Sequence, residues 1–133
     1  MKHQALIDRI IEIAEEHGWS VTVEEHRGNS KSIDLEFAQF TDRGQDFSFS
    51  AYMTDGDPRS LIKSIDDYYE NYDPDEEAIL WAGPDGHGKN GAPYRLSEII
   101  KDMEDVEAMV KELLDALIDA DLENEDWEEE ALD

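Results

Sequence analysis

The chain combines an ordinary domain length with an extreme charge: its 133 residues include 36 Asp and Glu against 11 Lys and Arg, a formal net charge of −25. Such a field repels nucleic acid and anionic membranes and attracts basic partners. The absence of cysteine excludes disulfides and thiolate metal sites, while the 39 % of apolar residues can bury one core. Because the sequence opens without the apolar stretch of a signal peptide and has no run of about 18 apolar residues, we expect a cytoplasmic protein.

The first half of the chain predicts one helix and three strands. Apolar residues from Leu6 to Ala14 recur at helical spacing over about residues 3–17, and Gly18 follows as a stop signal. Apolar and polar residues then alternate in three segments, at about residues 19–24, 33–38 and 47–53. Short polar loops join these segments, so we expect an antiparallel meander with one polar face.

The second half of the chain predicts helices. Asp57 before Pro58, and Asp73 before Pro74, are typical helix starts, since a side-chain acceptor precedes a proline at the first helical position. The second of these helices is short and ends at Gly83. Seven apolar residues then step by three and four along a heptad seam: Leu96, Ile99, Met103, Val106, Val110, Leu113 and Leu117.

A last helix over about residues 96–121 would be about 38 Å long at about 1.5 Å per residue, which is longer than a compact domain of this size is wide. Either it breaks near residues 102–105, or part of it projects and pairs with another chain. Four further residues widen the apolar stripe: Ile100, Met109, Leu114 and Ile118. The wider stripe favours packing on the sheet for most of the helix.

Together these elements predict an α+β fold, with an N-terminal helix, a three-stranded antiparallel meander, two short helices and a long C-terminal helix packed on the sheet. Residues 1–121 are expected to form one domain, followed by an acidic, flexible tail at residues 122–133. The residues expected in the core are Ile10, Val21, Val23, Leu35, Phe37, Phe47, Phe49, Ile65, Val106 and Leu113.

The loop from Gly83 to Asn90 nearly fits a phosphate-binding pattern in which backbone amides and Lys89 would cradle phosphates. However, Asn90 stands where the pattern has a hydroxyl, and Gly91-Ala92-Pro93 follows where the pattern needs the N-terminus of a helix. We therefore expect no nucleotide cofactor. A phosphate- or nucleotide-binding enzyme that uses residues 83–91 is kept as an alternative.

Metal-binding and catalytic patterns are also incomplete. Acids between Asp119 and Glu130 fall at calcium-loop positions, but Asn124 stands where that loop needs glycine. No catalytic spacing of nucleophile, base and acid is present. The histidines are scattered along the chain, at His3, His17, His26 and His87. We expect no metal and no enzymatic activity.

A sharper hypothesis concerns the acids of the last helix. Six of them lie mostly three, four or seven positions apart and so share a broad face at steps of about 5 to 10 Å. Five are the expected partner-binding residues: Asp102, Asp105, Glu112, Asp115 and Asp119. Duplex DNA presents one phosphate per strand about every 3.4 Å of its axis, so such a row can imitate part of a strand.

Several short motifs lie between Asp57 and Ile118: Tyr72-Asp73-Pro74-Asp75-Glu76, Trp81, Gly91-Ala92-Pro93, Leu96, Asp102, and an apolar series ending in Leu113 and Leu117. In these residues the chain resembles small, acidic, uncharacterised bacterial proteins, some associated with phages and other mobile elements. Its composition is also similar to that of antirestriction proteins that mimic DNA. The resemblance implies a role in host interaction and attaches no catalytic role to any residue.

We therefore expect a non-enzymatic acidic interaction protein, a DNA mimic or an inhibitor of a basic nucleic-acid-binding protein. Its expected partner is a basic protein, with no direct contact to nucleic acid or membranes. The alternative is a helix-mediated assembly subunit, a homodimer formed through the C-terminal helix. A salt-loving host would produce a similar composition, and the sequence leaves that explanation of the charge open.

Overall fold

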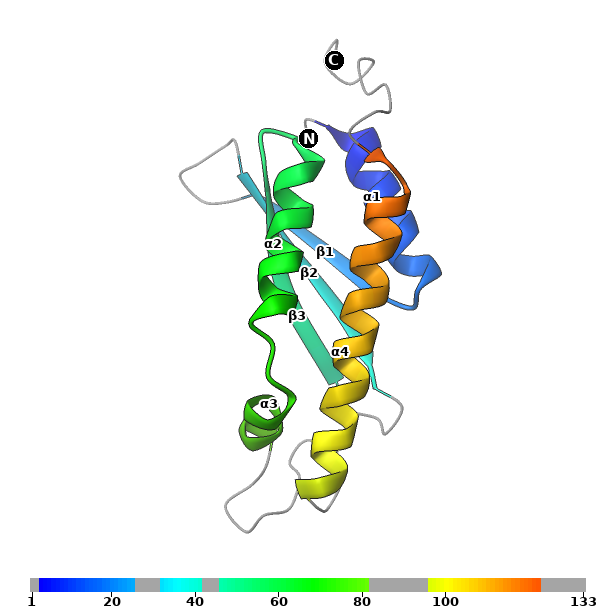
Figure 1. The fold of residues 1–133 in the computed structure, drawn as a ribbon. Coiled ribbons are helices and arrows are strands. Elements are labelled where there is room, and N and C mark those ends of the chain that lie inside the picture. Colours follow the sequence, from blue (N-terminus) through cyan, green and yellow to red (C-terminus); the bar gives the residue numbers. More distant parts are fainter. Residues whose placement is uncertain (1–2, 26–31, 42–45, 82–95, 123–133) are drawn as a thin grey trace.

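The order of elements follows the expectation from sequence. The structure, a computed structural model, describes residues 3–25, 32–41, 46–81 and 96–122. Its elements are α1 (Gln4–Glu16), β1 (Ser20–Glu25), β2 (Ser32–Phe40), β3 (Asp46–Thr54), α2 (Pro58–Glu70), α3 (Pro74–Trp81) and α4 (Leu96–Asp119). The predicted α+β fold is confirmed, with a three-stranded sheet behind and the helices in front of it (Figure 1).

The sheet is an antiparallel meander with the strand order β1-β2-β3. Its register places Val21 opposite Phe37, and Phe37 opposite Phe49, so these three residues share one face. On β2 and β3 the residues of that face are mostly buried, whereas most of the alternate residues are exposed. Helices therefore cover one face of the sheet, and the predicted polar face is present on the other side.

Helix ends confirm two local predictions. After α1, Gly18 adopts a φ of 87°, and the amide of Trp19 donates to the carbonyl oxygen of Ala14 at 3.0 Å. This left-handed turn ends the helix as a glycine cap does. At the start of α2, Asp57 accepts a hydrogen bond from the amide of Arg59 at 3.0 Å.

Helix α4 is continuous over its 24 residues, so the break considered near residues 102–105 does not occur. It runs alongside α2 and α1 and crosses the covered face of the sheet (Figure 1). The described residues of the heptad seam are all buried: Ile99, Met103, Val106, Val110, Leu113 and Leu117. The seam therefore packs inside its own chain and is not a surface for a second helix.

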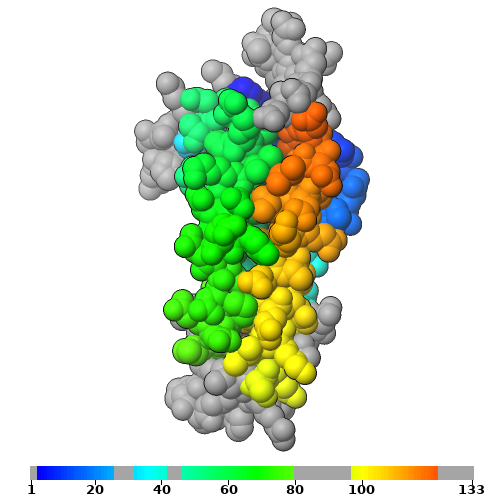
Figure 2. All heavy atoms as spheres, viewed as in Figure 1, coloured from blue at the N-terminus to red at the C-terminus, as the bar shows by residue number. Residues whose placement is uncertain are grey.

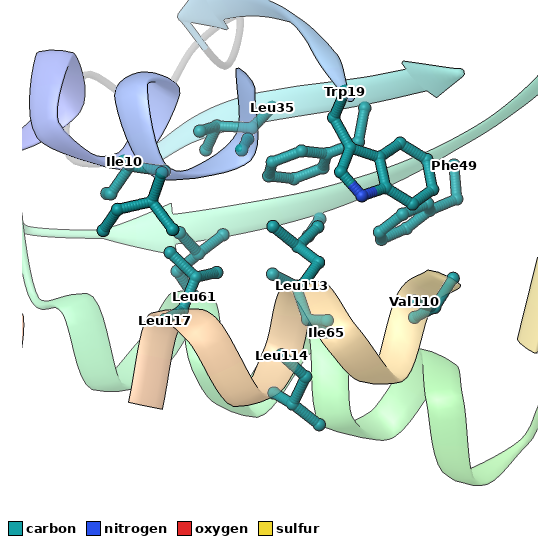
Figure 3. Packing of buried hydrophobic residues seen from close by; sticks show 14 of the residues in the cluster. Ile10, Trp19, Leu35, Phe49, Leu61, Ile65, Val110, Leu113, Leu114 and Leu117 are labelled. Carbon is teal, nitrogen blue, oxygen red and sulfur yellow. The ribbon is translucent and has the colours of Figure 1, made fainter. Parts of the chain in front are cut away.

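The core is centred on Trp19, whose side chain is 2 % exposed. Its ring meets Phe37 and Phe49 edge-on, at 6.5 Å and 5.5 Å between centroids, and the same buried cluster includes Val110 and Leu113 of α4 (Figure 3). Such edge-to-face packing suits the charge distribution of aromatic rings. The predicted core residues are buried, except that Val21 and Val23 on β1 are only partly buried.

Two details complete the packing. Along the edge of β3, Ser64 and Ser60 of α2 accept hydrogen bonds from the amides of Tyr52 and Thr54, at 3.2 Å and 2.9 Å. These bonds satisfy part of an edge that would otherwise be open to another strand. At the other end of the chain, Leu122, which we expected to begin the tail, is buried in the core. Residues 123–133 lie outside the described part of the chain.

Candidate interaction surface

Four of the five predicted contact residues form an outward row on α4. Asp105, Glu112, Asp115 and Asp119 are all exposed. Their spacing of seven, three and four positions keeps them on one face of the helix, opposite the buried seam. From Asp105 to Asp119 the row extends over about 21 Å at about 1.5 Å per residue.

The fifth predicted contact residue, Asp102, does not belong to this row, and the prediction for it is wrong. Its side chain is fully buried, and its carboxylate accepts a hydrogen bond from the hydroxyl of Thr41 at 2.5 Å. Asp102 follows Ile99 by three positions and precedes Val106 by four, so it shares the side of α4 that faces the core. It therefore contributes to the packing of α4 against the end of β2 and not to the outward row.

Two neighbouring side chains modify the charge of the row. Nδ1 of His17, at the end of α1, lies 2.6 Å from Oε1 of Glu112. Lys111, next to Glu112, donates to Asp115 one turn further along α4 at 2.7 Å, and this hydrogen bond raises the pKa of Lys111. Asp115 is therefore partly balanced within its own helix. Exposed pairs of this kind contribute little to stability, and they can exchange for contacts with a partner.

The surface around the row is shallow. A depression of about 430 Å³ lies between the end of α1 and α4, bordered by His17, Glu112, Asp115 and Asp119. Small side chains, Ala108 and Ala116, form part of its lining. An open, charged surface of this shape suits contact with another macromolecule better than enclosure of a small molecule.

Sequence reasoning missed a second acidic area, on the open face of the sheet. There the register places Thr22 opposite Glu36, and Glu24 opposite Asp34, around a depression of about 270 Å³. The signal was present as acids at the polar positions of adjacent strands. It could not be combined into one surface before the register was known, because a shift of one residue moves a side chain to the other face.

Half-buried titratable groups gather where α2 and α3 meet α4. Burial raises the pKa of Tyr68, Tyr72 and Glu77 above their ordinary values. The hydroxyl of Tyr72, between α2 and α3, donates to the carbonyl oxygen of Met103 at 3.0 Å, which ties this segment to α4. Tyr68 and Tyr72 are buried among aromatic rings, and the rings of Phe49 and Tyr68 stack at 4.7 Å between centroids.

Several sequence motifs cannot be placed in this structure. The phosphate-like loop at residues 83–91 and most of the calcium-like segment lie outside the described residues, as do His26 and His87. Among the residues that are described, no group of His, Asp and Glu is arranged to hold a metal ion. The same residues contain no helix with the length and apolarity needed to cross a bilayer.

No protein family model matches the chain, and comparison with curated proteins and with solved structures also gives no match.

Proposed function

We propose that this chain is a non-enzymatic acidic interaction protein that binds a basic, nucleic-acid-binding protein through the outer face of α4. The observation that carries the proposal is the exposed row of Asp105, Glu112, Asp115 and Asp119 on one continuous helix. The apolar seam of α4 is buried against the sheet, which holds these four carboxylates in a fixed line. A rigid line of charge requires less ordering on binding than acids on a loose segment.

The row can imitate the charge pattern of part of a DNA strand. Four carboxylates over about 21 Å compare with about seven phosphates over the same length of one strand, so the row has roughly half the charge density of that strand. The spacing suits a partner whose Lys and Arg side chains reach several phosphates. The net charge of −25 adds long-range attraction for such a partner.

The experiment is a capture assay with the full chain and a bacterial lysate, at low and high NaCl. We expect captured proteins to be basic nucleic-acid-binding proteins that duplex DNA displaces, and capture to fall steeply with salt. The test variant combines Asp105→Asn, Glu112→Gln and Asp119→Asn. If each lost pair contributes up to about 1 kcal/mol, the affinity should fall by about tenfold to a hundredfold.

A matched control removes the same charge from the open face of the sheet, with Glu24→Gln, Glu36→Gln and Asp46→Asn, all exposed residues. This control should bind nearly as well as the parent chain, because only the long-range part of the attraction changes. Equal losses in the two variants would show that total charge, and not α4, drives binding. Capture that neither NaCl nor duplex DNA reduces would refute the proposal.

A further inference from the structure

A groove separates the outer faces of α2 and α4. It has a volume of about 490 Å³ and is lined by apolar side chains, including Ile62, Leu114, Leu117 and Ile118. Ile118 borders the groove and is 50 % exposed. The view in Figure 2 shows α2 in green and the second half of α4 in orange, side by side on this face.

The rim of the groove differs in charge from the rest of the molecule. Of the five Lys and Arg residues among those described, two line the groove, Arg59 and Lys63 on α2. Two acids also line it, Asp66 on α2 and Asp121 after α4. The lining is therefore neutral in a chain of net charge −25. Arg59 and Lys63 also pair within the chain, with Asp57 at 3.1 Å and Asp67 at 3.1 Å.

We propose that this groove is the surface through which two copies of the chain associate, around a two-fold axis. A two-fold interface brings the same patch of both copies together, so the patch must be self-complementary, and apolar surface with charges of both signs can be so. The α2–α4 groove meets that requirement. The row on α4 does not, because it would bring carboxylates against carboxylates.

The order of charges on α2 supports a two-fold arrangement. Arg59, Ile62, Lys63 and Asp66 lie at positions i, i+3, i+4 and i+7 and share one face of the helix. When two such helices meet antiparallel with the axis beside Ile62 and Lys63, Arg59 of one copy faces Asp66 of the other. The symmetry produces this pair twice, and Ile118 adds apolar contact from α4.

Association through the groove leaves the row on α4 exposed, so a dimer would present two such rows. Dimer formation and the proposed binding of a basic protein can be distinguished by how each depends on salt. Two copies of the same charge repel, and salt screens that repulsion, so the dimer should become stronger as NaCl is raised. Binding of a basic partner should become weaker over the same range.

The test is sedimentation equilibrium of the full chain in a dilution series at low and high NaCl. We expect a reversible dimer with a dissociation constant that falls as salt rises. Ile118→Asp should abolish the dimer, because it buries a charge in each half of the interface. Ile79→Asp, which alters an isoleucine that is 64 % exposed on α3, is the matched control and should leave the dimer intact.

A charge exchange tests the pairing itself. Arg59→Asp alone and Asp66→Arg alone should each weaken the dimer by tenfold or more, since each places like charges together at two symmetric positions. The combined variant should recover most of the affinity, which a purely structural effect of either substitution would not do. Circular dichroism of each variant confirms that the fold is retained.

A parent chain that stays monomeric at every salt concentration would overturn the proposal, whether the groove then holds residues 123–133 or a different protein. A dimer that persists in Ile118→Asp, or single charge variants that the combined variant fails to rescue, would overturn it as well. None of these outcomes affects the proposed basic partner, because that proposal depends on other residues of α4.

Discussion

At the scale of single residues, position on α4 separates acids that look equivalent in the sequence. Asp102 and Asp105 are only three positions apart, yet Asp102 is fully buried and Asp105 is exposed. A buried carboxylate needs hydrogen-bond donors, and the hydroxyl of Thr41 provides one. Asp102 is therefore a structural residue whose loss should affect folding.

The first prediction is that Asp102→Ala lowers the free energy of unfolding by about 1–3 kcal/mol, because it removes the acceptor of a buried hydrogen bond. Urea unfolding of the purified chain measures the change. Asp119→Ala, at an exposed position of the same helix, should stay within about 0.5 kcal/mol of the parent. Equal effects of the two substitutions would contradict the structural role of Asp102.

At the scale of elements, local signals account for most helix and strand positions. The caps at Asp57 and Gly18 depend on backbone geometry and neighbouring side chains alone. Asp57 is the clearer case, because it accepts from the amide of Arg59 and also pairs with the guanidinium of Arg59. The hydrogen bond from the Arg59 side chain holds the pKa of Asp57 below its ordinary value of 3.8.

We expect Asp57→Ala to cost about 1 kcal/mol of stability, the usual effect of losing an N-terminal cap. Because the pKa of Asp57 is lowered by folding, its ionised carboxylate stabilises the fold above about pH 3.8, and this contribution is lost as the pH falls through the lower folded value. Asp57→Asn keeps an acceptor that does not titrate, so its advantage over alanine should persist in acid. Urea unfolding at neutral and acidic pH distinguishes the variants.

At the scale of the whole molecule, a small apolar core supports a large charge of one sign. The core contains Trp19, the aromatic residues of β2 and β3, and the seam of α4, while acids occupy the outside of α4 and the open face of the sheet. Repulsion among these acids opposes compaction, because the folded chain holds them closer together than the unfolded chain does. The protein should therefore be sensitive to ionic strength.

A rise in NaCl is expected to raise the melting temperature by several degrees, since about 1 kcal/mol corresponds to roughly 4 °C for a chain of this length. Differential scanning calorimetry at a low protein concentration measures the shift without a contribution from association. Neutralising Glu24, Glu36 and Asp46 together should raise the melting temperature at low salt and flatten its dependence on NaCl. A melting temperature that salt leaves unchanged would show that the repulsion is negligible.

Periodicity and helix-start signals together predicted the fold, since the expected segments correspond to the helices and strands of the structure. Periodicity placed Trp19 in a strand. In the structure Trp19 precedes β1, directly after Gly18, and is buried in the core. Periodicity also did not predict the acidic area on the sheet or the α2–α4 groove. These features depend on which elements become neighbours, and that is decided by long-range packing.

The sequence by itself determined the α+β class, the order of elements and the concentration of acids on the last helix, because charge and hydrophobic periodicity are local properties. Only the tertiary structure decided that the heptad seam packs inward, that Asp102 is buried while Asp105 is exposed, and that Arg59, Lys63 and Ile118 border one groove. The physical reason is that burial of an apolar stripe fixes the rotation of α4 about its axis. That rotation selects which of its acids can meet another molecule.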